Sequence, residues 1–126
     1  MRRLWGAVGG MALLLALALW NAAELEDFTQ RLSDTLREAE QRVEAGDWAE
    51  AQDLTKEAKT TWDQRDLWLH VTLRHTDTDA VQTGFDQVLA LIDCQDQAEY
   101  ASASAQLLQR LSLMAAGEQL TLANLF

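Results

Sequence analysis

The residues best suited to chemistry are one histidine and two aspartates near the middle of the chain. His75 stands four residues before Asp79, with Asp77 between them. If a helix begins by residue 75, the imidazole and the Asp79 carboxylate share one face and could bind a divalent cation. The same run is typical of a helix start, where an aspartate accepts hydrogen bonds from free amides. We favour the helix start and predict no metal site, with these three residues as the candidates should a cation bind.

The single cysteine, Cys94, excludes a disulfide within the chain and a cysteine-cluster zinc site. Its neighbour Ile92 and the adjacent helix end predict a partly buried, unreactive thiol, with an intermolecular disulfide as the alternative. The sequence contains no G-x-S-x-G or H-E-x-x-H motif and no phosphate-binding glycine loop. We therefore predict that the chain is not an enzyme, has no catalytic residue and binds no cofactor.

The amino-terminal residues have the pattern of a membrane-spanning helix. Met1-Arg2-Arg3 precedes residues 4–23, which carry no charge and as a helix would span about 30 Å, the thickness of a bilayer's hydrocarbon core. Trp5 and Trp20 flank this segment at the depth of the interfacial aromatic belts. Arginines before it and acidic residues after it predict a cytoplasmic amino terminus and an extracytoplasmic remainder. A cleavable signal peptide is disfavoured, because bulky or polar Trp20 or Asn21 would stand where cleavage requires a small residue.

Small and aromatic residues mark further candidate contact sites. Gly6 and Gly10 form a G-x-x-x-G pair that would let two membrane helices approach closely, so a homodimer through the anchor is one alternative. Trp48 and Trp62 lie two heptads apart and are expected in a helical core. Trp68 leans off their stripe, so it either fills a second interface or stands exposed for a partner.

The remaining chain has the periodicity of amphipathic helices. It contains no proline and no segment that alternates with a period of two, so strands are not expected. Gly46 and Gly117 are predicted to end the first and the last helix, and Asp47 and Asp96 to cap the second and the fourth. The second helix is predicted to continue to about Arg74. The four stripes comprise Leu25, Phe28, Leu32, Leu36, Ala39 and Val43; Trp48, Ala51, Thr55, Ala58, Trp62 and Leu69; Val81, Phe85, Val88, Leu89 and Ile92; and Tyr100, Ser104, Leu107, Leu108, Leu111 and Met114.

These elements predict an all-α fold, in which residues 1–23 are the membrane anchor and residues 24–126 form an extracytoplasmic domain. Two helical hairpins with short turns pack most simply as a four-helix bundle. Residues 117–126 are expected to follow as a short apolar tail, in which Leu122, Leu125 and Phe126 are candidate contact residues. All twenty acidic side chains lie after residue 23, so we expect no nucleic-acid partner.

Two motifs carry a resemblance to known sequences. Gly46-Asp47-Trp48 with Ala51 is weakly similar to the turn and second helix of a tetratricopeptide unit. The chain also ends in Leu-Thr-Leu-Ala-Asn-Leu-Phe over residues 120–126. Together with the apolar amino-terminal helix, Trp62, Trp68 and the His75–Asp79 pair, these motifs resemble the bacterial family known as domain of unknown function 4363.

The resemblance covers nearly the whole chain and implies a small, membrane-anchored, extracytoplasmic protein without an established activity. It also implies association with another small membrane protein. We therefore expect a helical module that contacts lipid through residues 4–23 and acts by protein contact, as an accessory or structural partner of another membrane protein. The alternative is an extracytoplasmic domain that senses a ligand or a divalent metal.

Overall fold

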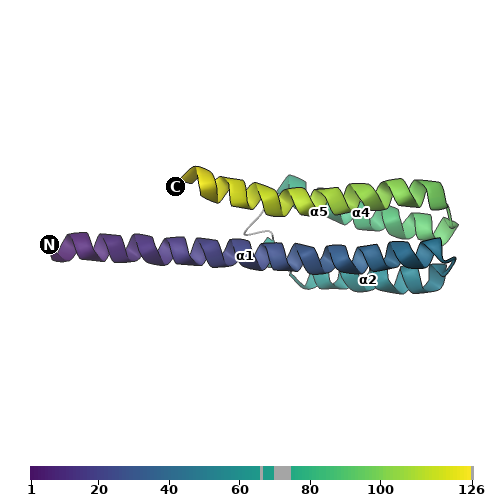
Figure 1. Cartoon of the computed structure of the whole chain (residues 1–126), viewed down its shortest axis with the longest axis horizontal. Helices are drawn as coiled ribbons and strands as arrows, with labels where there is room; N and C mark the ends of the chain where they lie inside the picture. The colour runs from purple at the N-terminus through teal and green to yellow at the C-terminus, as the bar shows by residue number, and fades with distance from the viewer. Residues whose placement is uncertain (66, 70–74, 126) are drawn as a thin grey trace.

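Helices account for nearly all of the described chain in the computed structural model (Figure 1). They are α1 (Arg2–Glu44), α2 (Trp48–Gln64), α4 (His75–Cys94) and α5 (Gln97–Leu125). The structure describes residues 1–65, 67–69 and 75–125, of which 75–76 and 118–125 are described by their backbone. Residues 67–69 are also helical, and no strand occurs within these ranges. The all-α prediction is confirmed.

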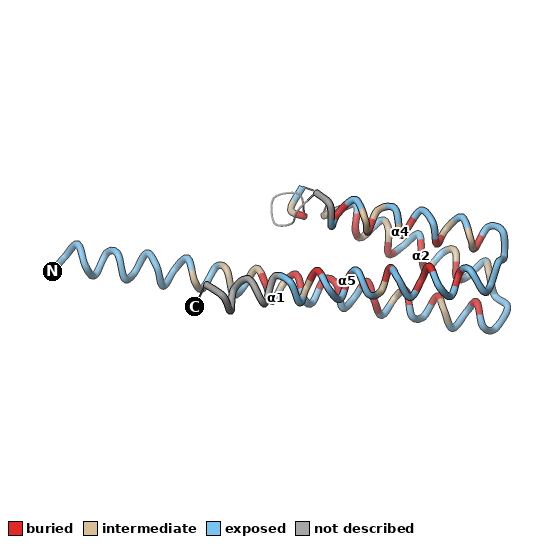
Figure 2. The backbone as a smooth tube through the Cα atoms, turned by 90° about the horizontal axis from the view of Figure 1, so that it is seen from above, coloured by how far each residue is buried: buried red, intermediate tan, exposed pale blue. Residues whose placement is uncertain are grey.

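The helices pack as an antiparallel, up-and-down bundle. α1 lies against α2 and α5, and α4 lies against the same two helices. The turns after α1 and after α4 are at one end of the bundle, whereas both chain termini point toward the other end (Figure 1). The amino-terminal half of α1 projects well beyond the bundle (Figure 2). This arrangement leaves that half of α1 without a packing partner inside the chain.

Short capped turns join the helices within each hairpin. Gly46 adopts a left-handed backbone with φ of 81°, a conformation that favours glycine because it has no Cβ. The Asp47 carboxylate then accepts a hydrogen bond from the Glu50 amide at 3.1 Å. The Asp96 carboxylate accepts the equivalent bond from the Glu99 amide at 3.2 Å. Both predicted caps, and the predicted helix stop at Gly46, are confirmed.

The core consists largely of the predicted apolar stripes, but Leu89 is only half-buried and lies outside it. All six stripe residues of α1 are buried, and Trp62 and Phe85 are among the largest fully buried side chains. Their rings lie next to each other with centroids 6.3 Å apart. Trp48 is half-buried against this core rather than enclosed by it. No polar atom of a described buried side chain lacks a hydrogen-bond partner, so burying the stripes leaves no polar group without compensation there.

Two predicted helix boundaries are wrong. α2 ends at Gln64 rather than near Arg74, because residues 63–66 are all polar and extending the helix through them would bury no apolar surface. α5 continues through Gly117 to Leu125, so residues 117–125 of the expected tail are helical. A glycine inside a helix costs only about 1 kcal/mol relative to alanine, which neighbouring strong helix formers such as Ala115 and Ala116 offset.

Candidate functional site

The amino-terminal half of α1 exposes an almost continuous apolar surface. α1 is the one described helix long and apolar enough to cross a membrane, and 6% of its most apolar stretch is buried. That apolar stretch is therefore not part of the bundle core, although a signal sequence passes the same test of length and composition. Figure 2 shows most of this half of the helix exposed, with Leu15 and Ala18 of intermediate burial. The large apolar side chains exposed along it are Leu4, Trp5, Val8, Met11, Leu13, Leu14, Leu17, Leu19 and Trp20.

Exposure gives way to burial within little more than one helical turn. Trp20 is 66% exposed, Ala22 is 7% exposed and Leu25 is fully buried. The helix is unbroken across this change, so no flexible linker separates the apolar half of α1 from the bundle. Because the bundle begins inside a continuous helix, its position relative to the apolar half of α1 is fixed by the helix itself.

Trp68 joins the base of the bundle to α1. Its Nε1 donates a hydrogen bond of 3.0 Å to Asn21 Oδ1. The indole meets the Phe28 ring edge to face, with centroids 6.0 Å apart. Of the two predicted alternatives for Trp68, the structure has the first, because the ring fills an interface within the chain.

An arginine closes this junction on its outer side. The Arg65 guanidinium carbon lies 5.2 Å from the centre of the Phe28 ring and 5.3 Å from that of Trp68. The Arg65 Nη1 nitrogen also lies 3.8 Å from Glu24 Oε2. A cation over two aromatic faces and beside one carboxylate is held by electrostatic attraction on both sides. This cluster of Glu24, Phe28, Arg65 and Trp68, together with Asn21, is called the junction below.

Leu67 is an exposed residue that was not among the predicted contact residues. Leu67 is 80% exposed, whereas Leu69, two residues later, is 1% exposed. The signal was present in the run Leu67-Trp68-Leu69, because three successive large apolar residues in a helical turn cannot all face one core. Leu67 is thus an exposed apolar residue directly beside the junction.

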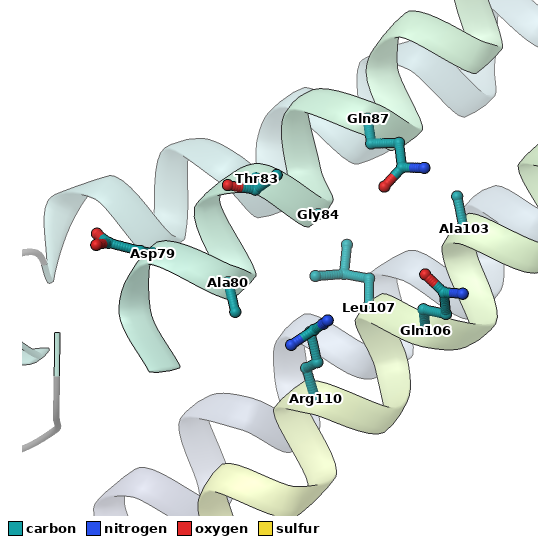
Figure 3. Close-up of a pocket in the computed structure, with 9 residues that line it drawn as sticks. All are labelled: Asp79, Ala80, Thr83, Gly84, Gln87, Ala103, Gln106, Leu107 and Arg110. Atoms are coloured by element: carbon teal, nitrogen blue, oxygen red, sulfur yellow. The ribbon is translucent and has the colours of Figure 1, made fainter. Parts of the chain in front are cut away.

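A groove lies between α4 and α5 (Figure 3). It measures about 250 Å³, with Gly84 and Leu107 on its floor and Thr83, Gln87 and Arg110 on its rim. A Cβ on Gly84 would stand 2.9 Å from Leu107 Cδ1, so the missing side chain lets the two helices approach closely. Asp79 also lines the groove, but its carboxylate points away from Arg110 in Figure 3. The groove therefore presents amides, a hydroxyl and one cation, without a catalytic arrangement among these lining residues.

The structure does not assemble the candidate metal ligands among the residues it describes. Asp77 and Asp79 are exposed, and the His75 side chain lies outside the described residues. Within the described part of the chain, no three histidine, cysteine or carboxylate side chains are grouped so as to hold a metal ion. Cys94 is exposed rather than partly buried, because it is the last residue of α4 and stands two positions past the core stripe that ends at Leu91 and Ile92.

The remaining candidates lie at the two ends of the chain. Gly6 and Gly10 are exposed on the projecting half of α1, and a Cβ at either position would meet nothing within 4 Å. Leu122 and Leu125 belong to the last turns of α5, with side chains outside the described set, and Phe126 lies outside the described residues altogether. Among the described residues, the structure brings no two of the predicted candidates together. Trp68 contacts α1 through Asn21 instead.

Comparison with known proteins identifies one family. No curated protein and no solved structure matches the chain. The family described as "Domain of unknown function (DUF4363)" matches residues 19–125. The match begins within the last exposed turn of the projecting half of α1, and it takes in the junction, the bundle and nearly all of α5. The chain therefore belongs to the DUF4363 family.

Proposed function

We propose that the protein is a single-pass membrane protein whose bundle acts outside the cytoplasm as an accessory or structural partner of another membrane protein. The observation that carries this proposal is the exposed apolar half of α1, which continues as one helix into the packed bundle. In water that surface would be a large aggregation-prone patch, whereas a bilayer covers it. A rigid connection also holds the bundle at a fixed height above the membrane, as a structural partner requires.

The charges around the anchor support the orientation. Arg2 and Arg3 precede the apolar segment, and Glu24, Glu26 and Asp27 follow it. Positive residues are retained on the cytoplasmic side, so the bundle would lie outside. The acidic surface of the bundle would also keep it from settling broadly on anionic headgroups.

The natural cysteine tests the orientation directly. Cys94 is exposed at the end of the bundle farthest from the anchor (Figure 1). In cells with an intact cytoplasmic membrane, we expect a membrane-impermeant maleimide to label the chain, and Cys94→Ser to abolish labelling. Labelling that requires permeabilised cells would place the bundle in the cytoplasm and overturn the orientation.

Partner contact is tested by purification from native membranes. Gly6 and Gly10 expose backbone on one face of the anchor, where a second helix can approach closely. We expect one membrane protein to copurify in constant ratio with the full chain in mild detergent. Gly6→Leu with Gly10→Leu should weaken that association, and Val8→Leu, on the opposite face of the helix, serves as the control. Recovery of the chain alone, with or without crosslinking, would contradict the accessory role, and recovery of a crosslinked second copy would replace it by a homodimer.

The alternative, an extracytoplasmic domain that senses a ligand or a divalent metal through His75, Asp77 and Asp79, draws no support from the residues that the structure describes.

A further inference from the structure

Leu67 is held at the level where the anchor meets the bundle. Its neighbour Trp68 is bonded to Asn21, and Asn21 directly follows Trp20 on α1. Tryptophan prefers the boundary between headgroups and acyl chains, so Trp20 marks the outer surface of the membrane if the anchor spans it. With 80% of its surface exposed, Leu67 is thus an apolar side chain placed at that boundary.

The charged residues of the junction lie on the other side of Leu67. Arg65 pairs with Glu24, which is one helical turn farther from the anchor than Trp20. Both side chains remain more than a third exposed, as expected for a pair in contact with water. On the opposite side, α1 carries no charge back to Arg3. The polar boundary therefore passes between the Arg65–Glu24 pair and Leu67.

A second element reaches the same level independently. Ser104 Oγ donates a 2.6 Å hydrogen bond to Glu40 Oε1, which fixes the register of α5 against α1. Because both helices rise by the same distance per residue, Leu125 falls level with about Leu19. α5 indeed extends past the ends of α2 and α4 (Figure 1). Its last charge, Glu118, falls level with about Glu26, so charges cease at nearly the same height on both helices.

We infer that the anchor-proximal end of the bundle rests in the outer headgroup region of the membrane, with Leu67 inserted among the phospholipids beside Trp20. This inference depends on the proposed anchor. It assigns a lipid contact to the bundle itself, in addition to the lipid contact of residues 4–23. The occupant is a phospholipid leaflet because the exposed leucine lies at the level of Trp20, where the apolar surface of α1 that lipid would already cover begins.

The test uses the full-length chain in phosphatidylcholine vesicles, with one environment-sensitive fluorophore attached to a single cysteine. Leu67→Cys in a Cys94→Ser background reports on the proposed contact. Leu113→Cys in the same background is the matched control, since Leu113 is also an exposed leucine, at 61%, but lies level with about Arg31 and so higher on the bundle. The natural Cys94 marks the far end.

We expect the label at position 67 to emit at shorter wavelength and to be quenched by nitroxide-bearing phospholipids. The labels at positions 113 and 94 should emit as they do in water and resist that quenching. Flotation of the vesicles establishes in the same sample whether the chain is anchored.

Three results would overturn the inference. A label at position 67 that emits as in water and is not quenched, in chains that float with the vesicles, would show that Leu67 does not contact lipid. The proposed anchor would stand. A short-wavelength label that nitroxide lipids do not quench shows that protein, rather than lipid, covers Leu67. If the chain does not float with the vesicles, both the proposed anchor and the proposed lipid contact of Leu67 are wrong.

Discussion

The Trp68 indole links three parts of the structure through one side chain. It donates to Asn21 in α1, meets the Phe28 ring and lies under the Arg65 guanidinium. These contacts tie the base of the bundle to the helix that forms the anchor. Their energies are separable, because phenylalanine keeps an aromatic ring at this position but has no N–H to donate.

We predict that Trp68→Phe lowers the free energy of unfolding by about 1 kcal/mol, the usual net value of one hydrogen bond. Asn21→Ala should cost a similar amount. The double variant should cost clearly less than the sum, because both changes remove the same bond. Chemical denaturation in detergent micelles, followed by circular dichroism, measures all three. Strict additivity would show that the bond contributes nothing to stability.

Tyr100 makes stability depend on pH at the other end of the core. Burial raises the pKa of its phenol to about 12, a hydrogen bond with Ser104 partly opposes this rise, and the nearby Glu40 charge adds to it. In the unfolded chain the pKa is about 10. Between these values the unfolded state loses its proton while the folded state keeps it, so raising the pH favours unfolding.

We therefore predict that stability is retained below about pH 10 and falls as the pH rises toward 12. Tyr100→Phe should remove most of that decline. Tyr100 is the single tyrosine of the chain, so phenolate absorbance reports its ionisation directly. Ionisation near pH 10 in the folded chain would contradict the raised pKa.

The sequence alone was enough to predict the roles of some of these side chains but not of others. Asp47 and Asp96 were predictable as caps because a cap depends on neighbours only three residues away. The exposure of Cys94 was not, because it depends on how far the last turn of α4 extends beyond the core. The partner of Trp68 was also out of reach, since Asn21 lies 47 residues away in the sequence.

At the scale of elements, the same logic explains which helix ends were predictable. Gly46 occupies a left-handed position, and the chain must reverse there to bring α2 beside α1. Gly117 has no such role, because α5 has room to continue alongside α1. Composition cannot distinguish a glycine that ends a helix from one inside a helix. The distinction depends on whether another element follows and must pack nearby.

Substitution by alanine should separate the two glycines. Gly117→Ala is predicted to stabilise the chain by about 0.5–1 kcal/mol, because alanine favours a helix interior and its Cβ would meet nothing within 4 Å. Gly46→Ala should destabilise it by about 1 kcal/mol, because the left-handed backbone strains any Cβ. Thermal unfolding of both variants provides the measurement. Destabilisation by Gly117→Ala would show that α5 ends there, as the sequence alone suggested.

At the scale of the whole molecule, the apolar half of α1 and the bundle share one helix, and packed structure extends to both sides of the boundary expected between residues 23 and 24. Ala22 is 7% exposed, and Asn21 is bonded to Trp68. We predict that a fragment of residues 19–126 is more stable than one of residues 24–126 by about 1–2 kcal/mol, from one hydrogen bond and one buried methyl group. For a domain of this size the melting temperatures should differ by about 4–16 °C. Asn21→Ala in the longer fragment removes the hydrogen bond, so it should reduce the difference in melting temperature by roughly half. Equal melting temperatures would mean that the bundle is complete from residue 24, and that α1 carries the anchor and the bundle without coupling their stability.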